Sequence, residues 1–154
     1  MNFEDIAAGR TLIVGIGNRQ RGDDGIGPVL IDRLKKAGFS NILDAGTVPE
    51  NYTKTIIEYS PDTVILIDAL SFGGRPGEYK IINVATCDEF GFSTHNASLK
   101  LFVTYISQLI SVNFFLLGIQ PATIDFKESL SPELEQTVNQ LVDLFTILFK
   151  HTTK

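Results

Sequence analysis

The chain has 154 residues, 44% hydrophobic and 20% charged, values that are ordinary for a globular protein and predict one domain over residues 1–154. The formal net charge of −5 argues against a nucleic-acid-binding groove, because such a groove needs clustered Lys and Arg. The single Cys87 excludes an intramolecular disulfide, and no basic and then apolar leader opens the chain, so we expect a protein of the reducing cytoplasm.

Short apolar runs alternate with helical patterns along the chain. The runs typical of strands are residues 11–15, 41–45, 63–68, 78–84 and 113–118. The helical patterns are residues 28–37, 52–59, 96–110 and 131–150. This alternation predicts an α/β fold, a three-layer α/β/α sandwich with a mainly parallel five-stranded sheet. Such folds place their sites in loops beyond the carboxyl ends of the strands.

The apolar stretch over residues 99–119 is long enough to suggest a membrane span. It contains Lys100, Gln108 and Asn113, however, and its pattern changes from helical spacing to a continuous apolar run. We therefore expect a packed helix followed by a core strand, with no insertion into a membrane.

A glycine-rich stretch, GIGNRQRGDDGIGP at residues 15–28, follows the first predicted strand. It does not match a dinucleotide fingerprint, because Gln20 stands where the third glycine belongs. It does not match a P-loop either, because Asp23 and Asp24 replace the Lys and the Ser or Thr. Carboxylates would repel a phosphate, so the loop is expected to present an acid to a cation or a polar substrate.

Five polar residues fall at the same predicted edge of the sheet. They are Asp24, Asp44, Asp68, His95 and Gln120. Each of them alone would be explained as a cap or turn residue. Taken together, carboxylates and an imidazole from separate connections indicate an open metal site with positions free for water or substrate.

The motifs GIGNRQRGDDGIGP, DAGTVPEN, LIDAL, STHNASL and LGIQP occur in this order. In that order they resemble the hydrogenase maturation endopeptidases, which process the large subunit of nickel–iron hydrogenases. The resemblance extends from Leu12 to about Gln120 and includes a compatible last helix. The LGIQP motif is most similar to the branch that serves hydrogenases of the formate-hydrogenlyase type.

The resemblance implies a cytoplasmic enzyme that removes a short C-terminal peptide from the large-subunit precursor once nickel has been inserted. Its nickel-sensing ligands would be Asp24, Asp68 and His95, with the nickel carried by the substrate and no organic cofactor. Asp44 would be a secondary position that affects processing, and we group it with Asp24 as catalytic.

Four further residues are expected to contact the substrate. They are Gly22, Asp23, Gly25 and Gln120. The glycines would let an extended tail pass close to the backbone.

Two other functions compete with this interpretation. A receiver-like signalling domain would use Asp68 as phosphoacceptor, but it needs a lysine at the end of the fifth strand, where Gln120 stands. A nucleotide-binding protein is disfavoured by the failed fingerprints described above.

Overall fold

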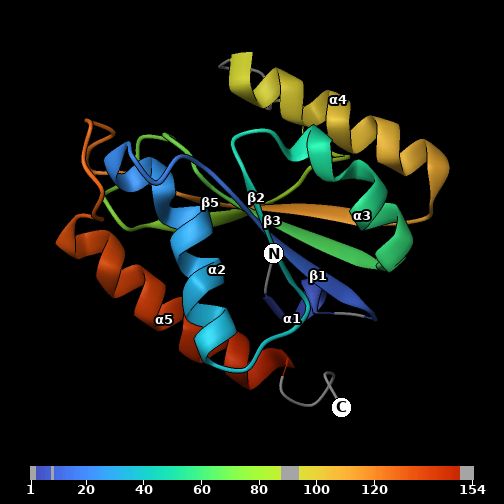
Figure 1. Cartoon of the computed structure of the whole chain (residues 1–154), viewed down its shortest axis with the longest axis horizontal. Helices are drawn as coiled ribbons and strands as arrows, with labels where there is room; N and C mark the ends of the chain where they lie inside the picture. The colour runs from blue at the N-terminus through green and yellow to red at the C-terminus, as the bar shows by residue number, and fades with distance from the viewer. Residues whose placement is uncertain (1–2, 8, 88–93, 150–154) are drawn as a thin grey trace.

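The computed structural model describes residues 3–7, 9–87 and 94–149, apart from the side chains of residues 4–5 and 94–97. A central five-stranded sheet carries helices on both faces (Figure 1). The strands are β1 (Thr11–Ile16), β2 (Ile42–Gly46), β3 (Thr63–Ala69), β4 (Tyr79–Asn83) and β5 (Asn113–Ile119). The helices are α1 (Phe3–Ile6), α2 (Ile26–Lys36), α3 (Thr53–Tyr59), α4 (Thr94–Leu109) and α5 (Pro132–Phe149), with 3₁₀ turns η1 (Gly22–Gly25) and η2 (Pro49–Tyr52). The predicted α/β sandwich is confirmed.

The strand order is β2-β1-β3-β5-β4, in which only β4 runs antiparallel to its neighbour. Gly15 of β1 pairs with Asp44 of β2, and Asp68 of β3 pairs with Gly118 of β5. Because these four strands are parallel, their carboxyl ends meet at one edge of the sheet. The loops that follow β1, β2 and β3 are therefore neighbours.

The apolar side chains of the strands form two layers, one on each face of the sheet, because successive side chains of a strand point to opposite faces. Ile13, Ile65 and Leu117 pack with α2 and α5 in one layer. Val14 and Leu66 pack with α3 and α4 in the other. In Figure 1, α2 and α5 lie on one side of the sheet and α3 and α4 on the opposite side. Covering both faces explains why β3 is buried almost throughout.

Helix α2 approaches the sheet closely because Gly27 has no side chain. A Cβ at this position would lie 2.4 Å from the carbonyl oxygen of Ile16 and 2.5 Å from that of Ile67. The absence of this atom lets the first turn of α2 contact the ends of β1 and β3. The loop between β1 and α2 is thereby held at the carboxyl edge of the sheet.

The predicted strands and helices appear with small changes at their ends. The short α1 was not predicted, and the pattern over residues 52–59 becomes η2 followed by α3. Residues 99–119 form most of α4 and then β5, as expected, and none of the described helices is long and apolar enough to cross a membrane.

Candidate active site

Residues 17–25, which we call the glycine loop, connect β1 to α2 and close on themselves. The backbone N–H of Asn18 donates to the carbonyl oxygen of Asp24 at 3.2 Å and to its carboxylate Oδ2 at 3.1 Å. Gly17 donates to the carbonyl of Gly46 at 2.8 Å, which ties the loop to the end of β2. A Cβ on Gly17 would lie 1.9 Å from the Asp24 carbonyl oxygen, so only glycine permits this closure.

Two further glycines of this loop allow other backbone segments to approach it closely. Gly22 has φ +57°, and a Cβ there would meet the carbonyl oxygen of Thr123 at 3.0 Å. A Cβ on Gly25 would lie 2.9 Å from the Cα of Arg19. These glycines therefore pack the loop tightly, and their predicted contact with substrate stays a prediction.

Asp23 anchors the glycine loop to the segment that follows β5. Its side chain is fully buried, and its Oδ1 accepts a hydrogen bond from the backbone N–H of Ser131 at 2.7 Å. Its Oδ2 accepts from the Ser131 hydroxyl at 2.7 Å and from the backbone N–H groups of Ala122 and Thr123 at 2.8 and 3.2 Å. These hydrogen bonds let Asp23 position the loop, and its predicted contact with substrate stays a prediction.

Asp24 and Asp68 are the two carboxylates that the structure brings together. Asp24 is half-buried on η1, whereas Asp68 is only 3% exposed at the end of β3. Burial raises the pKa of Asp68 well above the usual range, and the negative charge of Asp24 raises it further. A hydrogen bond from the backbone of Ala69 acts in the opposite direction and lowers this pKa. Turn η1, which carries Asp24, contacts β3, which carries Asp68, so the two carboxylates lie near each other at the carboxyl edge of the sheet.

A cavity of about 30 Å³ adjoins Asp68, with room for a water molecule or a single ion. It is lined by Ile16, Thr47, Pro49, Glu50, Asp68, Ser98 and Leu99. The Ser98 hydroxyl donates to Glu50 Oε1 at 3.2 Å. Neither Glu50 nor Ser98 was predicted as a site residue, although both lie in the motifs DAGTVPEN and STHNASL that we singled out in the sequence.

His95 belongs to the first turn of α4, but its side chain lies outside the part of the chain that the structure describes. Ser98 and Leu99 follow it by three and four residues, and both line the cavity beside Asp68. Among the described residues no group of three His, Cys, Asp or Glu side chains could hold a metal ion, and the predicted set with His95 stays a prediction.

Asp44 is held by an arginine of the glycine loop. Arg19 Nη2 donates to Asp44 Oδ2 at 2.7 Å, and the same guanidinium forms two hydrogen bonds with Asp32 of α2. These two carboxylates raise the pKa of Arg19, so the guanidinium stays charged. Asp44 Oδ1 accepts from the backbone of Gly46 at 3.0 Å. Asp44 is thus bound to the loop that carries Asp24.

Gln120 orders the loop between β3 and β4. Its Oε1 accepts hydrogen bonds from the backbone N–H groups of Phe72 at 2.8 Å and Gly74 at 3.1 Å. The residue lies at the predicted edge of the sheet, and its expected contact with substrate stays a prediction.

Comparison with known proteins identifies the relatives of this chain. The family described as hydrogenase maturation protease matches residues 28–147. The chain belongs to this family. A putative hydrogenase maturation protease of Methanocaldococcus jannaschii is 32% identical, with 88% of each chain covered. The hydrogenase 3 maturation protease of Escherichia coli K12 is 32% identical over 82% of this chain and 83% of its own.

A solved structure of a hydrogenase maturation protease has the same fold. The [NiFe] hydrogenase maturation protease HycI of Thermococcus kodakarensis superposes with a TM-score of 0.87 at 32% identity, covering 96% of this chain and 97% of its own. As a member of the hydrogenase maturation protease family, the chain is a peptidase. The receiver-like alternative with Asp68 as phosphoacceptor finds no support, since the relatives named here are all maturation proteases.

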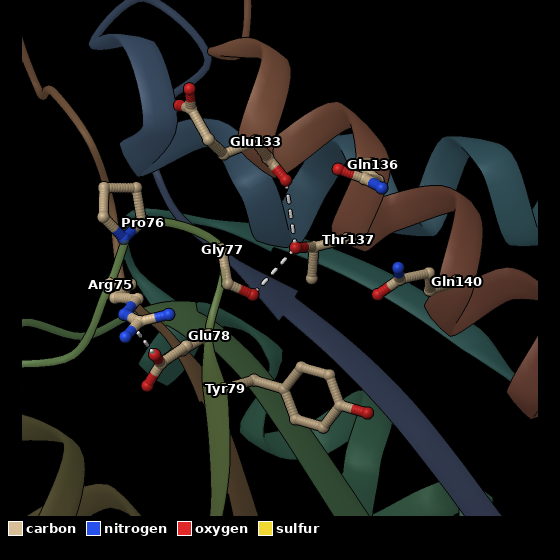
Figure 2. A pocket seen from close by; sticks show the side chains of 9 residues that line it. All are labelled: Arg75, Pro76, Gly77, Glu78, Tyr79, Glu133, Gln136, Thr137 and Gln140. Atoms are coloured by element: carbon tan, nitrogen blue, oxygen red, sulfur yellow. Dashed lines mark hydrogen bonds and ion pairs between the residues drawn. The ribbon is translucent and has the colours of Figure 1, made fainter.

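A second hollow in this maturation protease lies between the start of β4 and α5 and has a volume of about 490 Å³ (Figure 2). It is lined by Arg75, Pro76, Gly77, Glu78, Tyr79, Glu133, Gln136, Thr137 and Gln140. The Thr137 hydroxyl donates to the carbonyl oxygen of Gly77 at 2.8 Å and holds the two walls together. The lining includes none of the predicted site residues, so we centre the candidate active site on Asp24 and Asp68.

Asp68→Asn is expected to raise the melting temperature of the metal-free protein at neutral pH. The pKa of Asp68 in the folded state lies above its ordinary value of 3.8, so between these two values the folded protein binds more protons than the unfolded one. The free energy of unfolding therefore falls as pH rises through this interval, and an asparagine avoids that loss.

The measurement compares thermal unfolding of the wild type and Asp68→Asn, in chelator, from acid to neutral pH. The variant should gain in melting temperature relative to the wild type as pH rises, with Asp125→Asn as the matched exposed control. If the melting temperatures of the wild type and Asp68→Asn change with pH in parallel, burial does not disfavour the ionised Asp68.

Proposed function

We propose that the protein removes the C-terminal extension of a nickel–iron hydrogenase large-subunit precursor after nickel insertion. The observation that carries this proposal is the buried carboxylate of Asp68, which lines a small cavity bordered by the first turns of α4 and lies at the end of the strand that η1, with Asp24, contacts. Family membership supports the peptidase activity. The location that we propose for this processing is the cytoplasm, and the formate-hydrogenlyase type of hydrogenase is the proposed client.

The nickel ion that we propose for this site is part of the substrate. Asp24, Asp68 and His95 offer two carboxylate oxygens and one imidazole nitrogen, a donor set that a borderline divalent ion such as nickel accepts. Three ligands without a thiolate leave positions free, so the ion can also keep ligands from the precursor. Binding would then be strong only when metal and precursor are present together. No organic cofactor is needed for peptide hydrolysis by this route.

The hydrolysis itself needs a water molecule and a proton acceptor. We assign the acceptor role to Asp24, whose carboxylate is half-buried and adjoins the site rather than the core. The water oxygen adds to the scissile carbonyl while Asp24 takes one proton from the water, and Asp24 then passes this proton to the leaving amine as the C–N bond breaks. Asp44 supports this step through Arg19, which fixes the loop that carries Asp24.

The tail of the precursor is proposed to lie in extended form along the glycine loop. In this proposal Gly22 and Gly25 support the tail by shaping the loop, since both are buried and pack against the backbone of Thr123 and Arg19. Asp23 and Gln120 would support the bound tail indirectly, because Asp23 orders the segment before α5 and Gln120 orders the loop between β3 and β4. Holding the tail beside Asp24 supplies the positioning part of catalysis.

The test uses the purified protein and a nickel-loaded precursor, with loss of the tail followed by intact mass spectrometry. We expect one cut that releases the C-terminal extension and leaves the rest of the precursor whole. A precursor that keeps its tail under these conditions, or is cut at many sites, would overturn the proposed function.

A further inference from the structure

An exposed aromatic residue stands beside the candidate site. Phe126 is 82% exposed and lies in the segment between β5 and α5, together with Ile124 at 47%. The guanidinium of Arg21, from the glycine loop, lies over the Phe126 ring at 5.2 Å from its centroid. We call Arg21, Ile124 and Phe126 the rim patch.

The backbone beneath the rim patch is firmly held. The N–H of Gly22 donates to the carbonyl oxygen of Lys127 at 2.7 Å, and the N–H of Lys127 donates to the carbonyl oxygen of Gln20 at 3.0 Å. The N–H of Asp23 donates to the carbonyl of Thr123 at 3.0 Å, beside the hydrogen bonds of its buried carboxylate. Figure 1 shows this segment, in orange, running beside the blue glycine loop. The patch is therefore preorganised, which lowers the entropic cost of binding a partner.

The composition of the rim patch is that of a protein-binding surface. Aromatic side chains and arginine are enriched among the residues that dominate binding energy in protein interfaces. No ion pair is formed by Arg21 with the carboxylates of the described residues, so its charge is available to a partner. The complementary surface would be an apolar depression for the Phe126 ring, edged by a carboxylate that meets Arg21.

We infer that the rim patch docks the folded body of the hydrogenase precursor whose tail enters the site. This inference rests on the proposed function. Its structural argument is continuity, because Arg21 and Asp24 belong to the same loop and lie three residues apart. A precursor that delivers its metal and tail to Asp24 must bring its folded body against the rim of that loop.

The experiment compares Phe126→Ala and Arg21→Gln with the wild type. Ile147→Ala is the matched control, because Ile147 is 71% exposed but lies near the far end of α5. Binding of nickel-loaded precursor is measured by calorimetry, and cleavage is followed at several precursor concentrations. Loss of the ring should weaken binding and raise KM about tenfold or more, with a much smaller change in kcat. Arg21→Gln should act in the same direction by a smaller factor, and Ile147→Ala should behave as the wild type.

Thermal unfolding and sedimentation velocity of the same proteins complete the test. Phe126→Ala should keep the melting temperature of the wild type, because the exposed ring buries little surface. Binding by Phe126→Ala equal to that of Ile147→Ala would overturn the inference. A second result would also overturn it: the wild type self-associates, and Phe126→Ala abolishes this self-association without changing precursor binding. The rim patch would then bind a second copy of the chain. If the wild type binds the precursor through Phe126 but never cuts it, the docking inference stands and the proposed function fails.

Discussion

Asp24→Asn is expected to reduce processing of the nickel-loaded precursor at least about a hundredfold, the loss typical of removing a general base. The substitution is nearly isosteric, and the asparagine oxygen can still accept the hydrogen bond from the backbone of Asn18 that closes the glycine loop. What disappears is the negative charge beside Asp68, and with it a carboxylate ligand and a proton acceptor. Activity should therefore fall while the fold is kept.

The control for this variant is Asp143→Asn, which removes an exposed carboxylate of α5 outside the rim patch. Cleavage is quantified by mass spectrometry and folding by thermal unfolding. A second readout is the titration of Asp68 by carboxyl NMR in metal-free protein. Since the charge of Asp24 raises the pKa of Asp68, that pKa should fall in Asp24→Asn. Near-normal cleavage by Asp24→Asn would remove Asp24 from the catalytic centre.

Asp23→Ala is expected to destabilise the fold by about 3 kcal/mol or more, because it leaves buried donors without an acceptor. The carboxylate accepts four hydrogen bonds, from the backbone and hydroxyl of Ser131 and from the backbone of Ala122 and Thr123. For a chain of this length the loss corresponds to a fall in melting temperature of roughly 6–12 °C.

Two variants show whether this loss comes from the acceptor rather than from packing. Asp23→Asn can keep the three hydrogen bonds to Oδ2 but turns its NH2 toward the backbone N–H of Ser131, so it should recover only part of the stability. Ser131→Ala removes only the hydroxyl and should cost about 1–2 kcal/mol. Thermal unfolding measures all three variants. A melting temperature of Asp23→Ala close to that of the wild type would show that the anchor contributes little.

The layers of the fold follow from local patterns in the sequence. The apolar runs of β1, β3 and β5 and the 3.6-residue spacing of α4 and α5 are visible without a structure, because burial on both faces requires them. The four-residue α1 has too short a pattern to be recognised. The hydroxyl of Ser131, which directly precedes α5, donates to Asp23, and the Ser131 carbonyl accepts from the first turn of α5.

The different positions of the two adjacent aspartates could not be predicted from the sequence. Asp23 and Asp24 are indistinguishable by composition, yet the turn η1 directs one into the interior and leaves the other beside Asp68. Glu50 reaches the cavity beside Asp68 although β1 lies between β2 and β3 in the sheet. The hydrogen-bond partners of the Asp23 carboxylate are 99 to 108 residues away along the chain, and Ser98 is 48 residues from Glu50. Only the strand order and the turn geometry bring them together.

We propose that cleavage depends on nickel carried by the precursor and sensed through Asp24, Asp68 and His95. The most direct measurement mixes one preparation of the purified protein with nickel-free and with nickel-loaded precursor and follows the tail by mass spectrometry. The loaded precursor should lose its tail, whereas the nickel-free precursor should keep it and bind more weakly. Efficient cleavage of the nickel-free precursor would contradict the nickel-sensing role, although the protein would still be an active protease.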